Sequence, residues 1–99
     1  MAVSATYLEK VKMSLRVTRT NFDGQISDLI EEARLDLTET ADIKTFDFDT
    51  CDALQSGAII AYVCYKWFDD DKYFVAYNDM KTKMALSSKY RSVMVDEES

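Results

Sequence analysis

Residues 22–39, with the sequence FDGQISDLIEEARLDLTE, decide the fold of this chain. Their apolar side chains recur at intervals of three and four positions, which is the period of one face of an α-helix. These side chains are Ile26, Leu29, Ile30, Ala33 and Leu37. Charged side chains occupy other positions, namely Asp28, Glu31, Glu32, Arg34 and Asp36. The stretch therefore predicts an amphipathic helix that packs its apolar stripe on a core and keeps its charges outside.

Three further helices are predicted, over about residues 6–16, 51–68 and 72–90. Thr6 and Glu9 have the spacing of a capping box, so the first helix should begin there. Its apolar stripe is Leu8, Val11 and Leu15. The last helix has the stripe Tyr73, Tyr77, Met80 and Met84. The expected caps of the later helices are Asn21 or Asp23, Asp49 or Thr50, and the acidic turn 69–71.

The helix predicted over residues 51–68 is apolar nearly all round, which is typical of the buried centre of a bundle. Gly57 within it indicates that another helix crosses close by. Residues 40–52 interrupt the helical period and predict a loop whose Phe46 and Phe48 fold back on the core, with a short strand over 44–48 as the alternative. Together these features predict one all-α domain over residues 1–99, a bundle of about four helices with a flexible C-terminal tail at 91–99.

Composition limits the classes of function. The 99 residues carry a net charge of −6, and the acidic residues concentrate in 21–52, where ten carboxylates face two basic residues. Tight nucleic-acid binding usually requires a basic stripe, which this sequence lacks. A chain of this size buries only about 60–70% of the surface that its extended form would expose, so its stability is marginal and contacts with neighbouring molecules would add to it.

The sequence offers few groups for catalysis or metal binding. It has no histidine, and its two cysteines, Cys51 and Cys64, form no C-x-x-C pair, so we interpret them as reduced, buried thiols. The acidic run from Asp47 to Asp52 lacks the glycine and the final glutamate of a calcium-binding loop. No stretch approaches the length of a membrane span. We therefore expect no enzyme activity, no cofactor, no metal and no membrane partner.

In their order and spacing, the predicted helices resemble the head–tail connector, or adaptor, family of tailed phages. The likeness covers residues 6–91. The matching residues are Leu8-Glu9-x-Val11-Lys12-x-x-Leu15-Arg16-Val17, Asp23-x-x-Ile26-x-x-Leu29-Ile30-x-x-Ala33, Ala58-Ile59-x-x-Tyr62-Val63 and Leu86-Ser87-x-x-Tyr90-Arg91. Where such proteins usually turn with a glycine after the second helix, this chain has Thr40-Ala41-Asp42 and a longer acidic loop.

The resemblance implies a protein made in the host cytoplasm that becomes part of the virion neck. It implies a homo-oligomeric, dodecameric ring that docks on the portal protein, contacts the next neck or tail-completion protein and lets DNA pass through its channel without sequence-specific binding. The alternative is a small acidic helical module, regulatory or mimicking DNA, that docks one protein partner.

Two sets of surface residues are candidates for these contacts. Between subunits, we expect a basic face of Lys10, Lys12 and Arg16 to meet an acidic face of Glu31, Glu32 and Asp36 on the next copy. For partner docking we expect aromatic residues near the acidic turn, because such side chains are enriched at interface hot spots, and a second group of residues in the tail. These are Trp67, Phe68, Tyr73, Tyr90, Arg91, Val93 and Met94.

Overall fold

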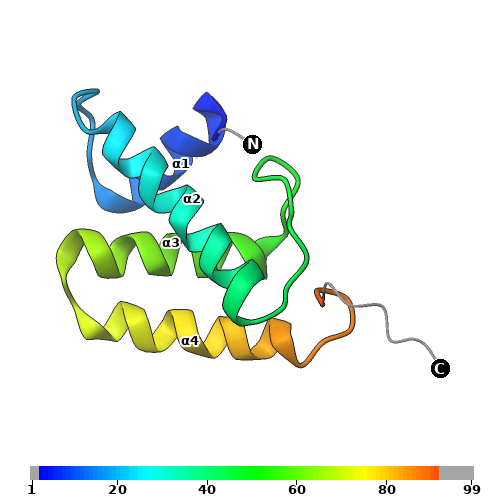
Figure 1. Cartoon of the computed structure of the whole chain (residues 1–99). Helices are drawn as coiled ribbons and strands as arrows, with labels where there is room; N and C mark the ends of the chain where they lie inside the picture. Colours follow the sequence, from blue (N-terminus) through cyan, green and yellow to red (C-terminus); the bar gives the residue numbers. More distant parts are fainter. Residues whose placement is uncertain (1–2, 92–99) are drawn as a thin grey trace.

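The computed structural model describes residues 3–91, which form four α-helices. They are α1 (Ala5–Leu15), α2 (Asp23–Thr40), α3 (Ala53–Phe68) and α4 (Asp71–Ala85). In this part of the chain, β structure is limited to one isolated antiparallel bridge between Ile43 and Arg91. Figure 1 shows α3 and α4 side by side as an antiparallel hairpin, with α2 crossing them and α1 beside α2. The predicted all-α fold is confirmed.

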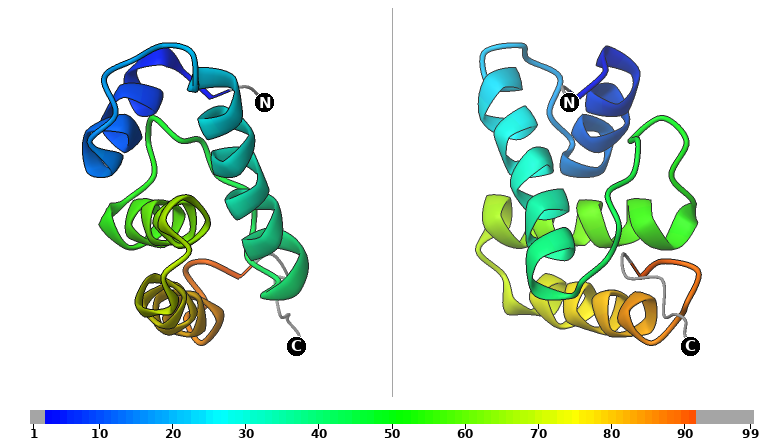
Figure 2. Two further views of the ribbon diagram at one scale, coloured as in Figure 1. Left: turned by 90° about the vertical axis from the view of Figure 1, so that its left-hand side faces the viewer. Right: turned by 45° about the vertical axis from the view of Figure 1, so that its right-hand side comes forward.

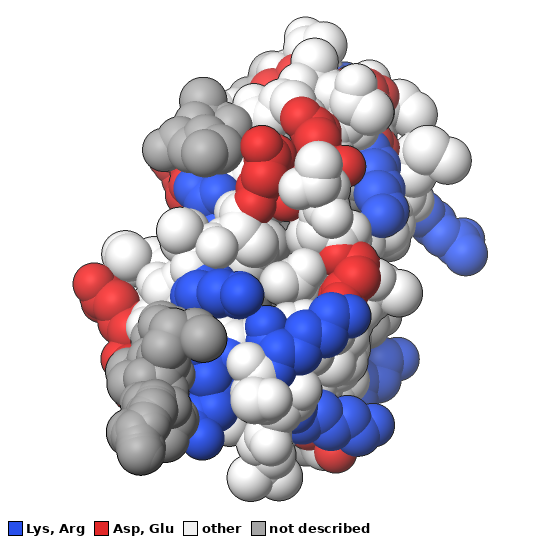
Figure 3. All heavy atoms as spheres, turned by 90° about the vertical axis from the view of Figure 1, so that its right-hand side faces the viewer, with Lys and Arg blue, Asp and Glu red and all other residues white. Residues whose placement is uncertain are grey.

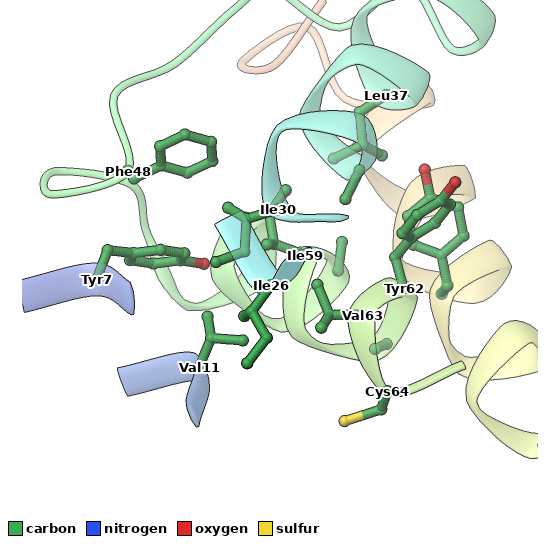
Figure 4. Packing of buried hydrophobic residues seen from close by; sticks show 14 of the residues in the cluster. Tyr7, Val11, Ile26, Ile30, Leu37, Phe48, Ile59, Tyr62, Val63 and Cys64 are labelled. Carbon is green, nitrogen blue, oxygen red and sulfur yellow. The ribbon is translucent and has the colours of Figure 1, made fainter. Parts of the chain in front are cut away.

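The core surrounds α3, as its sequence predicts. This helix packs against each of the other three, and most of its residues between Ser56 and Cys64 are buried. Ile59 and Val63 are fully inaccessible and meet the apolar stripe of α2, which Figure 4 shows pointing toward them. Burying a side chain of this size contributes about 1.5–3 kcal/mol relative to leaving it in water. The stripe of α2 consists of Ile26, Ile30, Ala33 and Leu37, all fully buried, with Leu29 half-buried.

Gly57 permits the close approach of α3 and α4, as predicted. A Cβ atom at this position would lie 2.9 Å from the Sδ atom of Met80. No real Cβ atom tolerates such a distance, so a larger residue would force Met80 to move. The two helices therefore meet over a glycine on one side and a methionine on the other.

Three helix starts differ from the sequence prediction. The side chain of Ser4, not that of Thr6, caps α1 by accepting a hydrogen bond from the Tyr7 N–H at 3.1 Å. Phe22 precedes α2 without any side-chain cap. Asp52 caps α3 in a reciprocal capping box with Gln55, in place of Asp49 or Thr50. Several residues that can cap a helix stand close together before these helices. Which of them becomes the N-cap depends on where the chain leaves the core.

The predicted end of α4 at Tyr90 is wrong, because the helix ends at Ala85. The chain turns through Ser87, whose side chain favours turns over helix interiors, and Tyr90 then packs back onto the core, 8% exposed. The Lys44 N–H donates to the Tyr90 carbonyl at 2.8 Å and the Tyr90 hydroxyl donates to Asp52 at 2.6 Å. Residues 92–99, which include Val93 and Met94 of the predicted tail, lie outside the described residues.

The segment between α2 and α3 is a loop, and its phenylalanines turn inward as predicted. Phe48 is buried, with its ring stacked on Tyr7 at a centroid distance of 5.1 Å (Figure 4). Arg34 was expected outside the core but is only 7% exposed. Its guanidinium lies 4.1 Å from the Phe48 ring and donates to the Phe46 carbonyl at 2.7 Å. The buried guanidinium thus holds the acidic loop between α2 and α3 in one conformation.

Ile30→Asp should unfold the isolated chain, because it places an unpaired carboxylate in a fully buried position. The cost is about 3–5 kcal/mol, which approaches the whole stability of a small domain. Circular dichroism during heating measures this. Leu35→Asp is the matched control, since Leu35 lies on the same helix but is 54% exposed. A cooperative transition of the Ile30 variant near that of the parent would contradict the assigned core face.

Candidate binding surfaces

An aromatic surface forms at the end of the α3–α4 hairpin. Asp69 adopts the left-handed conformation with φ 54°, and Asp70 caps α4 by accepting from the Lys72 N–H at 3.1 Å. This short turn, predicted from the acidic run, brings the last turn of α3 beside the first turn of α4. The hairpin-end surface comprises Phe22, Trp67, Phe68, Tyr73, Phe74 and Val75.

Rings on this surface contact one another in pairs. Phe68 and Tyr73 lie 5.9 Å apart between centroids, and Phe22 meets Trp67 edge-on at 5.5 Å. Trp67 and Tyr73 are half-buried, whereas Phe68 is 46% exposed and Val75 67%. Clustered exposed apolar residues on a soluble protein mark interaction sites more often than single ones do. Trp67, Phe68 and Tyr73 were predicted from the sequence, whereas Phe22 and Val75 were not. The sequence pattern does not show which apolar residues will lack a packing neighbour in the fold.

The remaining residues of the predicted docking set lie elsewhere. Tyr90 is buried and hydrogen-bonded to Asp52, at the start of α3, whereas Trp67 lies at its end. These two points are separated by the helix length, about 22 Å at 1.5 Å per residue. Tyr90 is therefore a structural residue of the fold, and Arg91, the other residue of this group that the structure describes, is exposed. Tyr90 was expected in a free tail, but its side chain is buried against the core.

Lys12 was predicted to lie on an exposed basic face, and this prediction is wrong. Its side chain is 2% exposed, and its ammonium group lies 2.7 Å from a carboxylate oxygen of Asp23 and 3.5 Å from Glu9. Hydrogen bonding to Asp23 raises the pKa of Lys12. The ion pair joins α1 to the first residue of α2. Lys10 and Arg16 are exposed and remain available on the surface of α1.

Two carboxylates of the predicted acidic face also hold the fold together. Glu32 accepts a hydrogen bond from the Tyr62 hydroxyl, and Asp36 accepts one from the Tyr77 hydroxyl. Lys81 adds an ion pair to Asp36 at 3.1 Å. These contacts form a polar seam between α2 and the α3–α4 hairpin, which sequence reasoning missed. Tyr62 and Tyr77 are 8% and 1% exposed, so the seam lies at the edge of the core.

Burial governs the titration of both tyrosines in the seam. Desolvation, followed by the adjacent carboxylate, raises the pKa of Tyr62 and of Tyr77 above their ordinary value of 10.0. Burial likewise raises the pKa of Tyr7, to about 12, and of the free thiols of Cys51 and Cys64. Cys64 is buried as predicted, whereas Cys51 is half-buried and donates to the Phe48 carbonyl.

Charge is unevenly spread over the surface. Figure 3 shows basic side chains gathered across the lower half of one face, toward the end of α4, and acidic ones mainly above them. Residues 80–91 contain four basic residues and no acidic one. Lys81 pairs with Asp36, Lys83 with Asp79 at 3.1 Å and Lys89 with Asp52 at 3.4 Å. Most of this positive charge is thus balanced within the chain.

One open pocket of about 280 Å³ lies beside α2. It is lined by Glu31, Glu32, Arg34, Leu35, Thr38 and Thr45. Among residues 3–91, no group of three or more His, Cys, Asp or Glu side chains could hold a metal ion. In the same described range, none of the helices is both long and apolar enough to cross a membrane.

Comparison of the chain with models of known protein families, with curated proteins and with solved structures finds no match.

Tyr77→Phe should lower the free energy of unfolding at pH 8 by about 1–2 kcal/mol, because Asp36 loses a hydrogen bond at the edge of the core. The raised pKa of Tyr77 means that its contribution is fully present below pH 10.0 and is lost as the pH rises above it. Urea denaturation at pH 8 and above pH 10 measures both effects.

The control is Tyr73→Phe, since the Tyr73 hydroxyl has no hydrogen-bond partner among residues 3–91. It should leave stability unchanged at both pH values. Equal stability of the Tyr77 variant and the parent at pH 8 would show that the seam contributes nothing.

Proposed function

We propose that this chain is a structural subunit of the head–tail connector of a tailed phage. In this role it forms a homo-oligomeric ring in the virion neck, docks on the portal protein and contacts the next neck or tail-completion protein. DNA crosses the ring without sequence-specific contacts, because a subunit with a net charge of −6 does not grip phosphates.

The observation that carries the proposal is the hairpin-end surface. Four of the seven exposed large apolar side chains of residues 3–91 gather there, namely Phe22, Phe68, Phe74 and Val75, which favours a protein that binds another protein. The resemblance of residues 6–91 to connector proteins supplies the identity of that partner, namely the portal. The predominantly helical, small subunit is consistent with this role.

The second candidate is a small acidic helical module that docks a single protein partner. The same hairpin-end surface supports it, and the acidic residues of 21–52 favour a basic partner, including one whose DNA site the module would occupy. The genes next to the coding gene distinguish the two candidates. Portal, protease and capsid genes beside it would favour the connector.

Val75→Glu and Phe68→Glu should each weaken binding to the portal protein of the same genome by about tenfold or more, because both residues are exposed on the proposed docking surface. Co-purification and binding titration with the purified portal measure this. The control is Leu86→Glu, which changes an even more exposed apolar residue directly after the other end of α4. A parent chain that does not bind the portal would overturn the connector and favour the binding module.

A further inference from the structure

Two exposed apolar residues lie on the outer faces of α1 and α2. Met13 is 77% exposed and stands two positions from the buried Val11 and Leu15, so it points away from the core. Leu35 is 54% exposed and has the same relation to the buried Ala33 and Leu37 on α2. Neither residue takes part in the hairpin-end surface.

Charges of opposite sign surround these two residues. Lys10 and Arg16 flank Met13 at three positions on either side and are exposed. Within residues 3–91 neither forms an ion pair, and the Lys10 ammonium group lies 5.8 Å from the centre of the Tyr7 ring. Glu31 and Glu32 precede Leu35 by four and three positions and are half-exposed, at 36% and 50% of their side chains. Glu31 already accepts from Arg34, and Glu32 accepts from Tyr62 and lies 3.7 Å from the Lys66 ammonium group, yet both carboxylates stay partly open to solvent and can accept further bonds.

Leu35 also borders the pocket between α2 and Thr45. At about 280 Å³, the pocket is smaller than most small-molecule sites, which run from roughly 300 to 1,000 Å³. It is of the size that receives a side chain from another protein. Methionine suits such a role, since its flexible thioether adapts to irregular gaps and could lie against Leu35 among the polar residues of the lining.

The two surfaces do not face the same way. In the left view of Figure 2, α1 and α2 lie on opposite sides of the upper half of the molecule. A copy that presents Met13 on one side therefore presents the Leu35 pocket on the other. Contacts of this head-to-tail kind between identical chains build rings when the rotation closes, and filaments when it does not.

We infer that Met13 of one copy, with Lys10 and Arg16, seats in the pocket at Leu35 of the next copy, with Glu31 and Glu32 around it. The occupant is a second copy because both halves of the match, an apolar residue framed by positive charge and one framed by negative charge, lie on one chain. The contact deepens the proposed ring, from which it takes its biological setting, but its chemistry does not depend on the portal. Lys12 and Asp36, which bind within the subunit, take no part in it.

The test uses two variants, each with one damaged face. Met13→Glu and Leu35→Glu should each weaken self-association by about tenfold or more, while circular dichroism stays that of the parent, because both residues are exposed. Mixed in equal amounts, the two variants should form a one-to-one dimer that grows no further, since each supplies the face that the other lacks. Sedimentation and native mass measurement distinguish monomer, dimer and ring, and raising the ionic strength should slow association.

Val75→Glu is the control, because it lies on the hairpin-end surface and should leave self-association unchanged while it weakens portal binding. A parent that stays monomeric up to about 1 mM, or a mixture of variants that forms no dimer, would overturn the inference. Self-association through this contact without portal binding would uphold it and overturn the connector. If the chain binds the portal but its Met13 and Leu35 variants assemble like the parent, the connector is upheld and the inferred contact is overturned.

Discussion

The burial of α3 is the constraint on which the rest of the structure depends. A chain of 99 residues has room for one core, and α3 fills it by presenting apolar side chains to three neighbouring helices at once. Its partners then need only one apolar stripe each, so their outer faces are free to carry charge. The small residues on α3 matter as much as the large ones, because Gly57 brings α4 close enough for Met80 to pack on the helix backbone.

Charged and polar groups at the edge of this core determine how the helices join. Lys12 ties α1 to Asp23, Arg34 holds the loop through Phe46, and the tyrosines of α3 and α4 bind carboxylates of α2. A buried charge is costly unless it is paired, so each of these contacts selects one arrangement of the helices over its alternatives. The acidic character of α2 is therefore partly structural, and only part of it remains for binding other molecules.

The helices and the central place of α3 could be predicted from sequence because burial imposes a period of 3.6 residues on apolar positions. The end of α4 could not, because no glycine or proline marks it and Tyr90 leaves the helix for a distant partner, Asp52. Lys12 was assigned to the surface because it is charged, although the aliphatic part of a lysine side chain can be buried. Its ion-pair partner Asp23 is eleven positions away, so no local pattern indicates the contact. Most aromatic residues of the hairpin-end surface could be predicted, because they lie close together in the sequence around the turn. Phe22 could not, because only the folded chain brings it next to Trp67.

Apart from Leu86, the large exposed apolar residues of 3–91 divide into two kinds of surface, and their separation has a consequence for assembly. The hairpin-end surface lies at the turn between α3 and α4, while Met13 and Leu35 lie on α1 and on the outer side of α2. In the proposed ring, a subunit would therefore contact its neighbours and still present the hairpin end to a different protein. Because α3 connects these regions as a rigid buried element, seating of a neighbour on α2 would hold the hairpin ends of all copies in one orientation. Repetition of a modest contact in this fixed geometry raises the strength of docking well beyond that of a single subunit.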